Sequence, residues 1–418
     1  MTPSDPWKKS VCCAARSDIG LRRGNNQDSF LVREAVTPRQ WLDHGHLFIV
    51  ADGMGAHVAG EVASRLAAET IAKSYLNRRN EPIDQALVHA VYDAHDMIRN
   101  KSREDAYRDM GTTCDAFVMA PAGLFIAHVG DSRVYRLRGR TFEQLTFDHS
   151  LIWEVCLATG VSLDQPPNYI PKNQITRSLG PTEKLIVDLE GPIPIEMNDI
   201  YLACSDGLSG QVNDGEIGQI LALFPPEIAA ETLINIANLR GGPDNITMVI
   251  VQALKDEKES GEVDLEMVAP LWHWGLLAGT AAAGAGAAAA LFGGQIPAGV
   301  ILAAAATAAA TAFFILTRKT LFAGSPFLWS SAPSGKAPYR SWECIFTGEF
   351  AHALAKILRE IFQATGGQPS LSAAQETAKK YEKEAVLSCQ KRNYAAAILN
   401  YARAINYLMR ELKKQTGT

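Results

Sequence analysis

The stretch Phe48-Ile-Val-Ala-Asp52-Gly53 joins a short run of β-forming apolar residues to an aspartate. Three further runs carry an aspartate at one end in the same way: 124–129 before Gly130-Asp131, 200–204 before Ser205-Asp206, and 246–251 after Asp244-Asn245. Short apolar runs of this kind predict buried strands. Carboxylates at four strand ends can converge on one place in a fold, and acidic oxygens without Cys or His are the ligands of hard divalent cations.

The composition is that of a globular protein, and it excludes several classes of function. The 418 residues suffice for two or three domains, and 47% of them are hydrophobic. A net charge of −5 gives no electrostatic reason to expect nucleic acid as a partner. The seven cysteines are odd in number and contain no Cys-x-x-Cys pair, which favours reduced thiols over a disulfide framework or a zinc site.

Residues 11–254 mix strand-like runs with helical stretches and form the first predicted domain. Helices are expected near 61–76 and 82–100, where apolar residues recur at helical spacing. The strands do not alternate regularly with helices, so a doubly wound parallel sheet is not predicted. The pattern favours an α+β class with a layered sandwich.

A charged linker at residues 255–268 precedes a segment of very different character, residues 271–317. Two apolar stretches, split by Gly293-Gly-Gln-Ile-Pro297, are each about as long as the roughly 20 residues that span a bilayer. Arg318 and Lys319 follow as a positive flank. The segment predicts two transmembrane helices in a hairpin. The alternatives are an Ala-rich helical hairpin packed within a soluble protein and a low-complexity linker.

The N-terminal residues lack the apolar core of a secretion signal. Together with the hairpin, this predicts a protein at the inner, cytoplasmic membrane, with its first domain and its tail facing the cytoplasm. The membrane would then be a partner through the hairpin.

The last region, residues 341–418, is predicted to be a helical tail. Within it, residues 371–415 resemble a single tetratricopeptide repeat, because small residues such as Ala385 and Ala397 recur where two helices would cross. One repeat cannot bury its own apolar face. A plain amphipathic hairpin explains the pattern equally well, and in either case we expect an interaction tail with a possible protein partner.

Eight short motifs occur in a fixed order along the first domain. They are Arg23-Gly-Asn-Asn26-Gln27-Asp28, Val50-Ala-Asp52-Gly53-Met54-Gly55, Met110-Gly-Thr-Thr113, Gly130-Asp131-Ser-Arg133, Asp148-His149-Ser150, Thr176-Arg177-Ser-Leu-Gly180, Ser205-Asp206-Gly207 and Gly242-Pro-Asp244-Asn245. This ordered set resembles the protein phosphatase 2C family of metal-dependent Ser/Thr phosphatases, in its bacterial form. The resemblance implies an α/β/β/α sandwich of two antiparallel sheets flanked by helices, with metals bound at one end.

The resemblance also implies metal ligands. Asp52 matches the aspartate that bridges two Mn²⁺ or Mg²⁺ ions, and the carbonyl of Gly53 matches a ligand of the second ion. Asp206 and Asp244 match the remaining carboxylate ligands of the first ion, and Asp131 matches a ligand of a weaker third ion. Two cations remove the repulsion between hydroxide and a phosphate dianion, so the expected reaction is attack by a metal-bridging water or hydroxide.

Further residues are assigned by the same resemblance. Arg23 matches the arginine that binds the substrate phosphate, since a guanidinium fits phosphate oxygens in a bidentate way. Asp28 matches an acid that orients the attacking water. Gln27 stands where many members have Glu, which would weaken the second metal site. Met54 replaces the histidine that animal members carry, so His57 is a second-choice acid after metal-bound water.

The expected substrates are phosphoserine and phosphothreonine proteins, the products of a Ser/Thr kinase. Residues 151–174 are expected to form a variable flap beside the site, and His149 is expected to brace a loop. From a different class of function, the alternative is a catalytically weak phosphoprotein-binding or scaffold module tethered to the membrane. Gln27 is the residue that favours this alternative.

Overall fold

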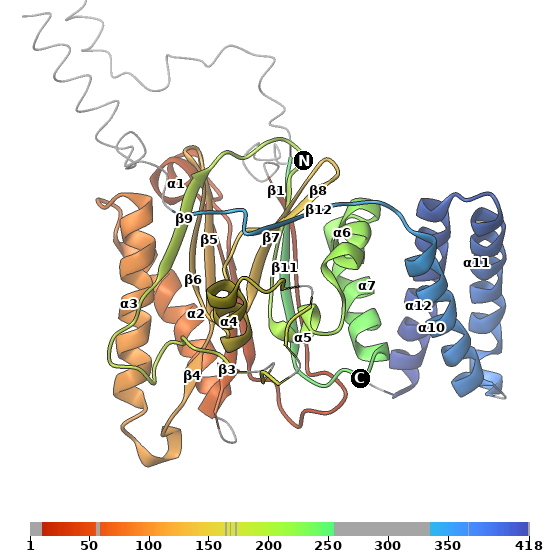
Figure 1. The fold of residues 1–418 in the computed structure, drawn as a ribbon, viewed down its shortest axis with the longest axis horizontal. Coiled ribbons are helices and arrows are strands. Elements are labelled where there is room, and N and C mark those ends of the chain that lie inside the picture. The colour runs from red at the N-terminus through yellow and green to blue at the C-terminus, as the bar shows by residue number, and fades with distance from the viewer. Residues whose placement is uncertain are drawn as a thin grey trace, which may run out of the picture. The chain divides into compact units, whose positions relative to one another are not determined.

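The structure is a computed structural model that describes residues 11–55, 59–163, 165–167, 169–171, 174–254, 335–366 and 368–416. In these parts the chain forms two antiparallel sheets, with helices on both outer sides (Figure 1). The predicted α+β sandwich of two antiparallel sheets flanked by helices is therefore confirmed.

Each sheet takes its strands from distant parts of the chain. Sheet A has the order β1 (Val11–Asp18), β11 (Ile246–Ala253), β10 (Ile200–Cys204), β7 (Arg133–Arg138), β8 (Thr141–Gln144) and β12 (Arg340–Glu343). Sheet B has the order β2 (Asp28–Arg33), β3 (His46–Met54), β5 (Cys114–Ala120), β6 (Gly123–Val129) and β9 (Asp188–Ile193). A short strand, β4 (Gly111–Thr112), pairs with the end of β3.

Long helices cover the outer face of each sheet. On sheet B these are α2 (Ala59–Asn77) and α3 (Ile83–Lys101), which agree with the two helices predicted from periodicity. On sheet A they are α6 (Asp214–Leu223) and α7 (Pro226–Leu239). Shorter elements lie in the connections: α1 (Pro38–His44), α4 (Leu151–Thr159), α5 (Asp206–Ser209) and a 3₁₀ turn at Asp105–Tyr107.

The apolar runs are continuous because both faces of each sheet are buried. Along β10, Tyr201 and Ala203 pack into the core between the sheets, whereas Leu202 and Cys204 pack toward α6 and α7. Phe48 of β3 stacks on Phe117 of β5 in the inner core, with ring centroids 4.9 Å apart. All seven cysteines are free thiols, as their odd number and spacing predict.

The C-terminal region packs on sheet A and its helices. It contains α10 (Gly348–Thr365), a 3₁₀ turn at Pro369–Leu371, α11 (Ser372–Gln390) and α12 (Tyr394–Thr416), so the predicted helical tail is present. The prediction was wrong at its start, because Arg340–Glu343 forms strand β12 at the edge of sheet A rather than helix. Leu354, Ile398 and Ile405 of the tail belong to the same apolar core as the outer face of sheet A.

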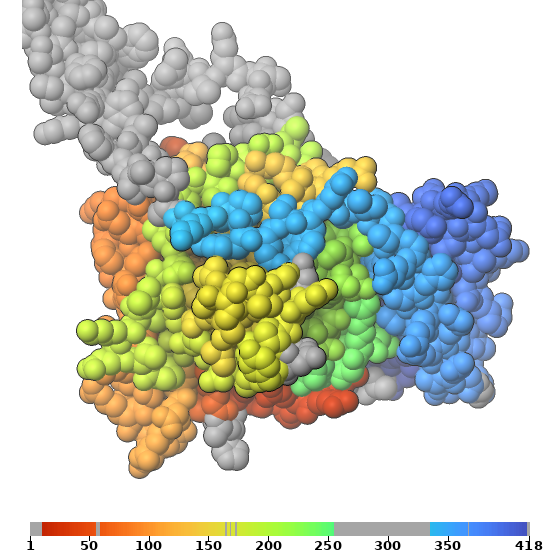
Figure 2. Space-filling view, viewed as in Figure 1, coloured from red at the N-terminus to blue at the C-terminus, as the bar shows by residue number. Residues whose placement is uncertain are grey.

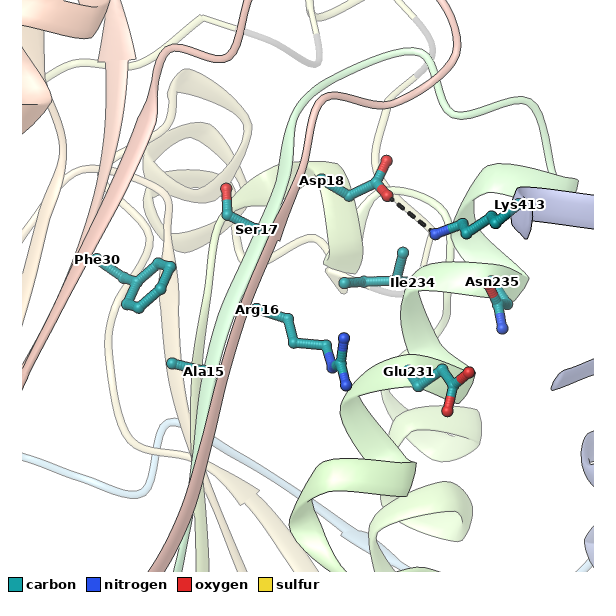
Figure 3. A pocket seen from close by; sticks show the side chains of 9 residues that line it. All are labelled: Ala15, Arg16, Ser17, Asp18, Phe30, Glu231, Ile234, Asn235 and Lys413. Atoms are coloured by element: carbon teal, nitrogen blue, oxygen red, sulfur yellow. Dashed lines mark ion pairs between the residues drawn. The ribbon is translucent and has the colours of Figure 1, made fainter. Parts of the chain in front are cut away.

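Polar contacts between α12 and α7 fix the position of the tail. Buried Asn406 donates to Thr232 Oγ1 at 2.7 Å and accepts from Asn235 Nδ2 at 2.9 Å. Lys413 Nζ lies 3.5 Å from Asp18 Oδ2, across a pocket of about 360 Å³ between β1 and α7 (Figure 3). The tail therefore contacts the first domain through matched apolar and polar groups.

The membrane prediction is corrected. No helix in the described ranges has both the length and the apolar character needed to cross a bilayer. The long helix α12, for example, carries Arg403, Arg410 and Lys413, and such charges are expensive in hydrocarbon. The predicted hairpin at residues 271–317 and the linker at 255–268 lie outside the described residues. The inner-membrane location is therefore withdrawn.

The Asn406 contacts yield a stability prediction. Asn406→Ala leaves the buried Asn235 amide and Thr232 hydroxyl without this partner, and we expect the free energy of unfolding to fall by about 1–3 kcal/mol. The measurement is urea denaturation of the full chain. The control is Arg403→Ala on the exposed side of α12, which should change the free energy by less than about 0.5 kcal/mol. Equal effects of both substitutions would show that this polar contact contributes nothing.

Candidate active site

Strand ends bring five aspartates together at one end of the two sheets. Asp52 of β3 lies opposite Asp28 in the β2–β3 register. Asp131 follows β6, Asp206 follows β10, and Asp244 precedes β11. Burial raises the pKa of the Asp52 carboxyl well above its ordinary value, and the charges of the other four raise it further. The four strand-end runs picked out in the sequence thus converge.

The other carboxyls show the same mutual repulsion. Burial, with the charges of Asp206 and Asp148, raises the pKa of Asp131 to about 7. Burial and the charge of Asp244 raise the pKa of Asp206, although a hydrogen bond with Asp52 and the charges of Arg133 and Arg23 partly oppose this. The site therefore concentrates more negative charge than its neighbouring guanidinium groups neutralise.

Asp28 is buried and is held by one of its two carboxylate oxygens. Ser205 donates its hydroxyl to Asp28 Oδ2 at 2.8 Å. Oδ1 has no hydrogen-bond partner in the described part of the chain. Burial raises the pKa of Asp28 to about 6, and the hydrogen bonds from Ser205 and Thr247 limit the rise. A buried acceptor without a protein donor is available to a water at the site.

Two glycines follow aspartates because other backbone segments pass very close to them. A Cβ on Gly53 would lie 2.1 Å from the carbonyl oxygen of Gly60 and 2.4 Å from that of Gln27. A Cβ on Gly207 would lie 1.9 Å from the carbonyl oxygen of Asn245. In this structure the Asp-Gly pairs are therefore places of tight packing, and not the simple surface turns that such pairs usually mark.

Thr113 and Asn245 fix the acidic loops, and the sequence reasoning gave neither of them a role. Thr113 Oγ1 accepts from the amide of Asp52 at 2.9 Å and lies 2.7 Å from the hydroxyl of Ser132, next to Asp131. Buried Asn245 accepts from the amide of Gln27 and donates to the carbonyl of Asn25, at 2.9 and 3.0 Å. Both residues stand in the quoted motifs, which is the signal that could have identified them.

Arg23 reaches the acidic cluster from the loop between β1 and β2. Its Nη2 donates to Asp244 Oδ2 at 2.7 Å, and close to half of its side chain is exposed. Asp244 also accepts from the backbone amide of Asn245 at 2.9 Å. The predicted phosphate-binding arginine and a predicted metal ligand are therefore paired with each other.

A cleft of about 540 Å³ opens above these groups. Its acidic lining residues, here called the floor, are Asp131, Asp206 and Asp244, and Arg23 also lines it. The predicted flap, residues 151–174, supplies three of the other lining residues, Ile152, Trp153 and Pro166. Together with Arg133, Asp148 and Ser150, these are here called the wall.

Three other residues were singled out in the sequence: Gln27, His57 and His149. Gln27 is buried beside the start of α2, where its side-chain amide donates to the carbonyl of Gly55 at 3.3 Å. His57 lies outside the described residues. His149 is buried and accepts from the amide of Gly130 at 3.0 Å, so it braces the loop that carries Asp131.

The chemistry of the donors fits a divalent metal. The cluster is all oxygen, and its carboxylates repel one another in a way that a cation would relieve. Among the described residues, no group of three or more His, Cys, Asp or Glu side chains already stands at metal-binding distances.

The repulsion among the carboxylates predicts an effect on stability. Because the pKa of Asp52 is raised in the folded protein, ionisation of this carboxyl destabilises the fold. The loss of stability is fully present at pH values above the folded-state pKa. In EDTA at pH 7.5, Asp52→Asn should therefore raise the unfolding temperature, by about 2–4 °C for each kcal/mol of repulsion relieved. Excess Mn²⁺ should stabilise the native sequence more than the variant. The control is Asp96→Asn, an exposed site on α3. A lower unfolding temperature for Asp52→Asn in EDTA would contradict this account.

His149 yields a prediction about pH. Burial lowers the pKa of its imidazole to about 4, against the opposing effect of Asp188, whose Oδ2 lies 3.0 Å from Nε2. An unfolded histidine titrates near 6.5, so between these values the unfolded state takes up a proton that the folded state does not. The free energy of unfolding should fall by roughly 2–3 kcal/mol from this residue between pH 7 and pH 4.5.

Urea denaturation of the native chain and of His149→Gln at both pH values isolates this contribution. The variant should lose less stability on acidification than the native chain. Equal losses would show that His149 is not responsible.

Comparisons with known proteins support the same assignment. The family model described as protein phosphatase 2C matches residues 22–152. Protein phosphatase PhpP of Streptococcus pneumoniae is 32% identical over 250 residues, which are 58% of this chain and 98% of the relative. Serine/threonine phosphatase stp of Listeria monocytogenes is 35% identical over 243 residues, which are 57% of this chain and 94% of the relative.

Solved structures agree. The serine/threonine phosphatase of S. agalactiae matches with a TM-score of 0.52 and 31% identity, over 59% of this chain and 100% of its own. PstP/Ppp of Mycobacterium tuberculosis matches with a TM-score of 0.51 and 32% identity, over 59% of this chain and 99% of its own. The chain therefore belongs to the protein phosphatase 2C family and is a protein serine/threonine phosphatase.

Proposed function

We propose that the chain hydrolyses phosphoserine and phosphothreonine in proteins with the help of two Mn²⁺ or Mg²⁺ ions. The convergence of Asp52, Asp131, Asp206 and Asp244 beside one cleft, which the last three of them line, is the observation that carries this proposal. When bound, such ions neutralise phosphate charge and lower the pKa of a shared water to make it the nucleophile.

The ligand roles are those that the family resemblance implies. Asp52, whose pKa the other four carboxylates raise, would be the ligand that the two ions share. The carbonyl of Gly53 is assigned to the second ion, and Asp206 and Asp244 to the first. Asp131, on the loop after β6, is assigned to a weaker third ion. The backbone approach that only glycine allows at Gly53 holds this segment in place.

Arg23 binds the phosphate of the substrate. Its guanidinium already sits at the cleft and pairs with Asp244, 2.7 Å away, through a contact that is open to solvent. Exposed ion pairs contribute little to stability, so the arginine can exchange Asp244 for a phosphate dianion at small cost. A bidentate contact then orients the phosphoester for attack.

Asp28 orients the attacking water. Ser205 fixes Oδ2, and the free oxygen Oδ1 accepts a hydrogen bond from the water.

We infer that the substrates are phosphorylated proteins. Ile152 and Pro166 of the flap are partly exposed and offer apolar contact beside the acidic residues of the cleft. The expected substrates remain products of a Ser/Thr kinase. The scaffold alternative rests on Gln27, whose amide braces Gly55 here. The tetratricopeptide-like character of residues 371–415 and a protein partner for the tail also remain predictions.

Activity of the purified full chain tests the proposal. With Mn²⁺ it should hydrolyse a phosphothreonine peptide, and excess EDTA should abolish turnover until metal is restored. Asp206→Ala should lower kcat/KM by at least about 100-fold, because a carboxylate ligand is lost. Metal binding without turnover, measured by calorimetry, would instead favour the scaffold.

Substitution of Arg23 tests its role in binding phosphate, and substitution of the neighbouring Arg22 is the matched control. Arg23→Ala should lower kcat/KM by about 10- to 100-fold, as expected for loss of charge-assisted hydrogen bonds to phosphate. Arg22→Ala, at an exposed position that does not line the cleft, should have little effect. Similar losses in both variants would reduce the role of Arg23 to general electrostatic attraction.

A further inference from the structure

A segment from beyond the family match crosses the catalytic half of the molecule. Residues 335–343, here called the strap, lie far along the chain from the matched residues 22–152. Figure 2 shows the light-blue strap running beside the yellow residues around α4 and on toward the tail helices. Its last four residues form β12, paired with β8 at the edge of sheet A.

The other end of the strap is bound to sheet B. Buried Glu190 of β9 accepts from the amide of Ala337 at 3.0 Å and from the hydroxyl of Tyr339 at 2.6 Å. The amide of Tyr339 donates to the carbonyl of Gln144 at 2.9 Å. A Cβ on Gly335 would lie 1.8 Å from Glu190 Oε2, so the chain passes directly over this carboxylate. The strap is thus fixed to both sheets.

An aromatic contact links the strap to the flap. The ring of Tyr339 packs against Phe147 with centroids 5.6 Å apart, and Phe147 packs edge-on against Trp153 at 5.0 Å. Trp153 lies on α4 and lines the cleft. Edge-to-face rings at these distances restrict one another's orientation. Tyr339 is therefore linked through Phe147 to Trp153 of the cleft wall.

An ionic contact links the strap to the same wall. Arg340 Nη1 lies 3.4 Å from Asp214 Oδ2, and Arg133 Nη1 lies 3.4 Å from Asp214 Oδ1. Arg133 also binds Asp148 with Nη2–Oδ2 at 2.7 Å, and both of these residues line the cleft. Asp214 therefore shares its charge between an arginine of the strap and an arginine of the substrate site.

We propose that Tyr339 and Arg340 are positioning residues that set the affinity for phosphoprotein substrates through Trp153 and Arg133. This rests on the proposed phosphatase function of the cleft. In this proposal a phosphopeptide reaches the wall as well as Arg23 and the metal site, whereas a small aryl phosphate reaches only Arg23 and the metal site. Loss of the strap contacts therefore weakens peptide binding and leaves the chemistry of the small substrate unchanged.

Steady-state kinetics on the full chain with Mn²⁺ test this split. Tyr339→Ala and Arg340→Gln should each raise KM for a phosphothreonine peptide by about three- to tenfold, a range typical of residues that act through a contact network. Their kcat values for p-nitrophenyl phosphate should stay within about twofold of the native value. Tyr339→Phe, which keeps the ring, and Arg340→Lys, which keeps the charge, should restore most of the peptide affinity.

Ser341→Ala is the matched control, because Ser341 lies between Arg340 and Trp342 on β12 and is exposed. It should behave like the native chain with both substrates. The inference is overturned if Tyr339→Ala and Arg340→Gln match Ser341→Ala in peptide KM. It is also overturned if both substrates lose activity equally in the Tyr339→Phe and Arg340→Lys variants, since that outcome indicates a merely structural role. A native chain inactive on both substrates would refute the proposed function itself.

Discussion

Repulsion among the carboxylates at the ends of β3, β6 and β10 is the constraint on which the rest of the site depends. Asp52, Asp131 and Asp206 would separate in a flexible chain, because the charges of Asp131 and Asp206 raise the pKa of Asp52 and the charge of Asp206 raises that of Asp131. They are held together by groups without charge. Thr113 joins the Asp52 backbone to the Asp131 loop, and Asn245 joins β11 to the loop that carries Arg23. Burial of the apolar core between the sheets offsets the free energy that this repulsion costs.

The substrate cleft is built from two sources that lie far apart in the sequence. Its acidic floor comes from strand ends of the phosphatase sandwich. Its wall, including Trp153 and Arg133, is linked to Tyr339 and Arg340 of the strap. The tail helices follow the strap in the sequence and share an apolar core with α7. The part of the chain that resembles known phosphatases therefore does not form the whole of the molecule's catalytic face.

The sequence predicted the sandwich and the convergence well, because these depend on local patterns. Runs such as 246–251 are apolar on both faces, and a carboxylate stands beside each. It could not predict that Arg23 pairs with Asp244, since the two are brought together only by the fold. It also assigned residues 341–343 to the helical tail, because a strand of only four residues has little periodicity to detect. The predicted membrane location failed for a different reason: it rested on the composition of residues 271–317, outside the described structure, and no described helix can cross a bilayer.

The late position of β12 affects how the protein is made. Roughly 90 residues separate the end of β11 from β12, which at about 5–20 residues per second takes on the order of 5–20 s to synthesise. During that interval β8 is an open edge of sheet A, and the side of α7 that α12 later covers is bare. An open edge and a bare apolar face are the features that draw nascent chains into mispairing. The nascent phosphatase domain thus presents both surfaces until β12 and α12 have been synthesised and have packed against them.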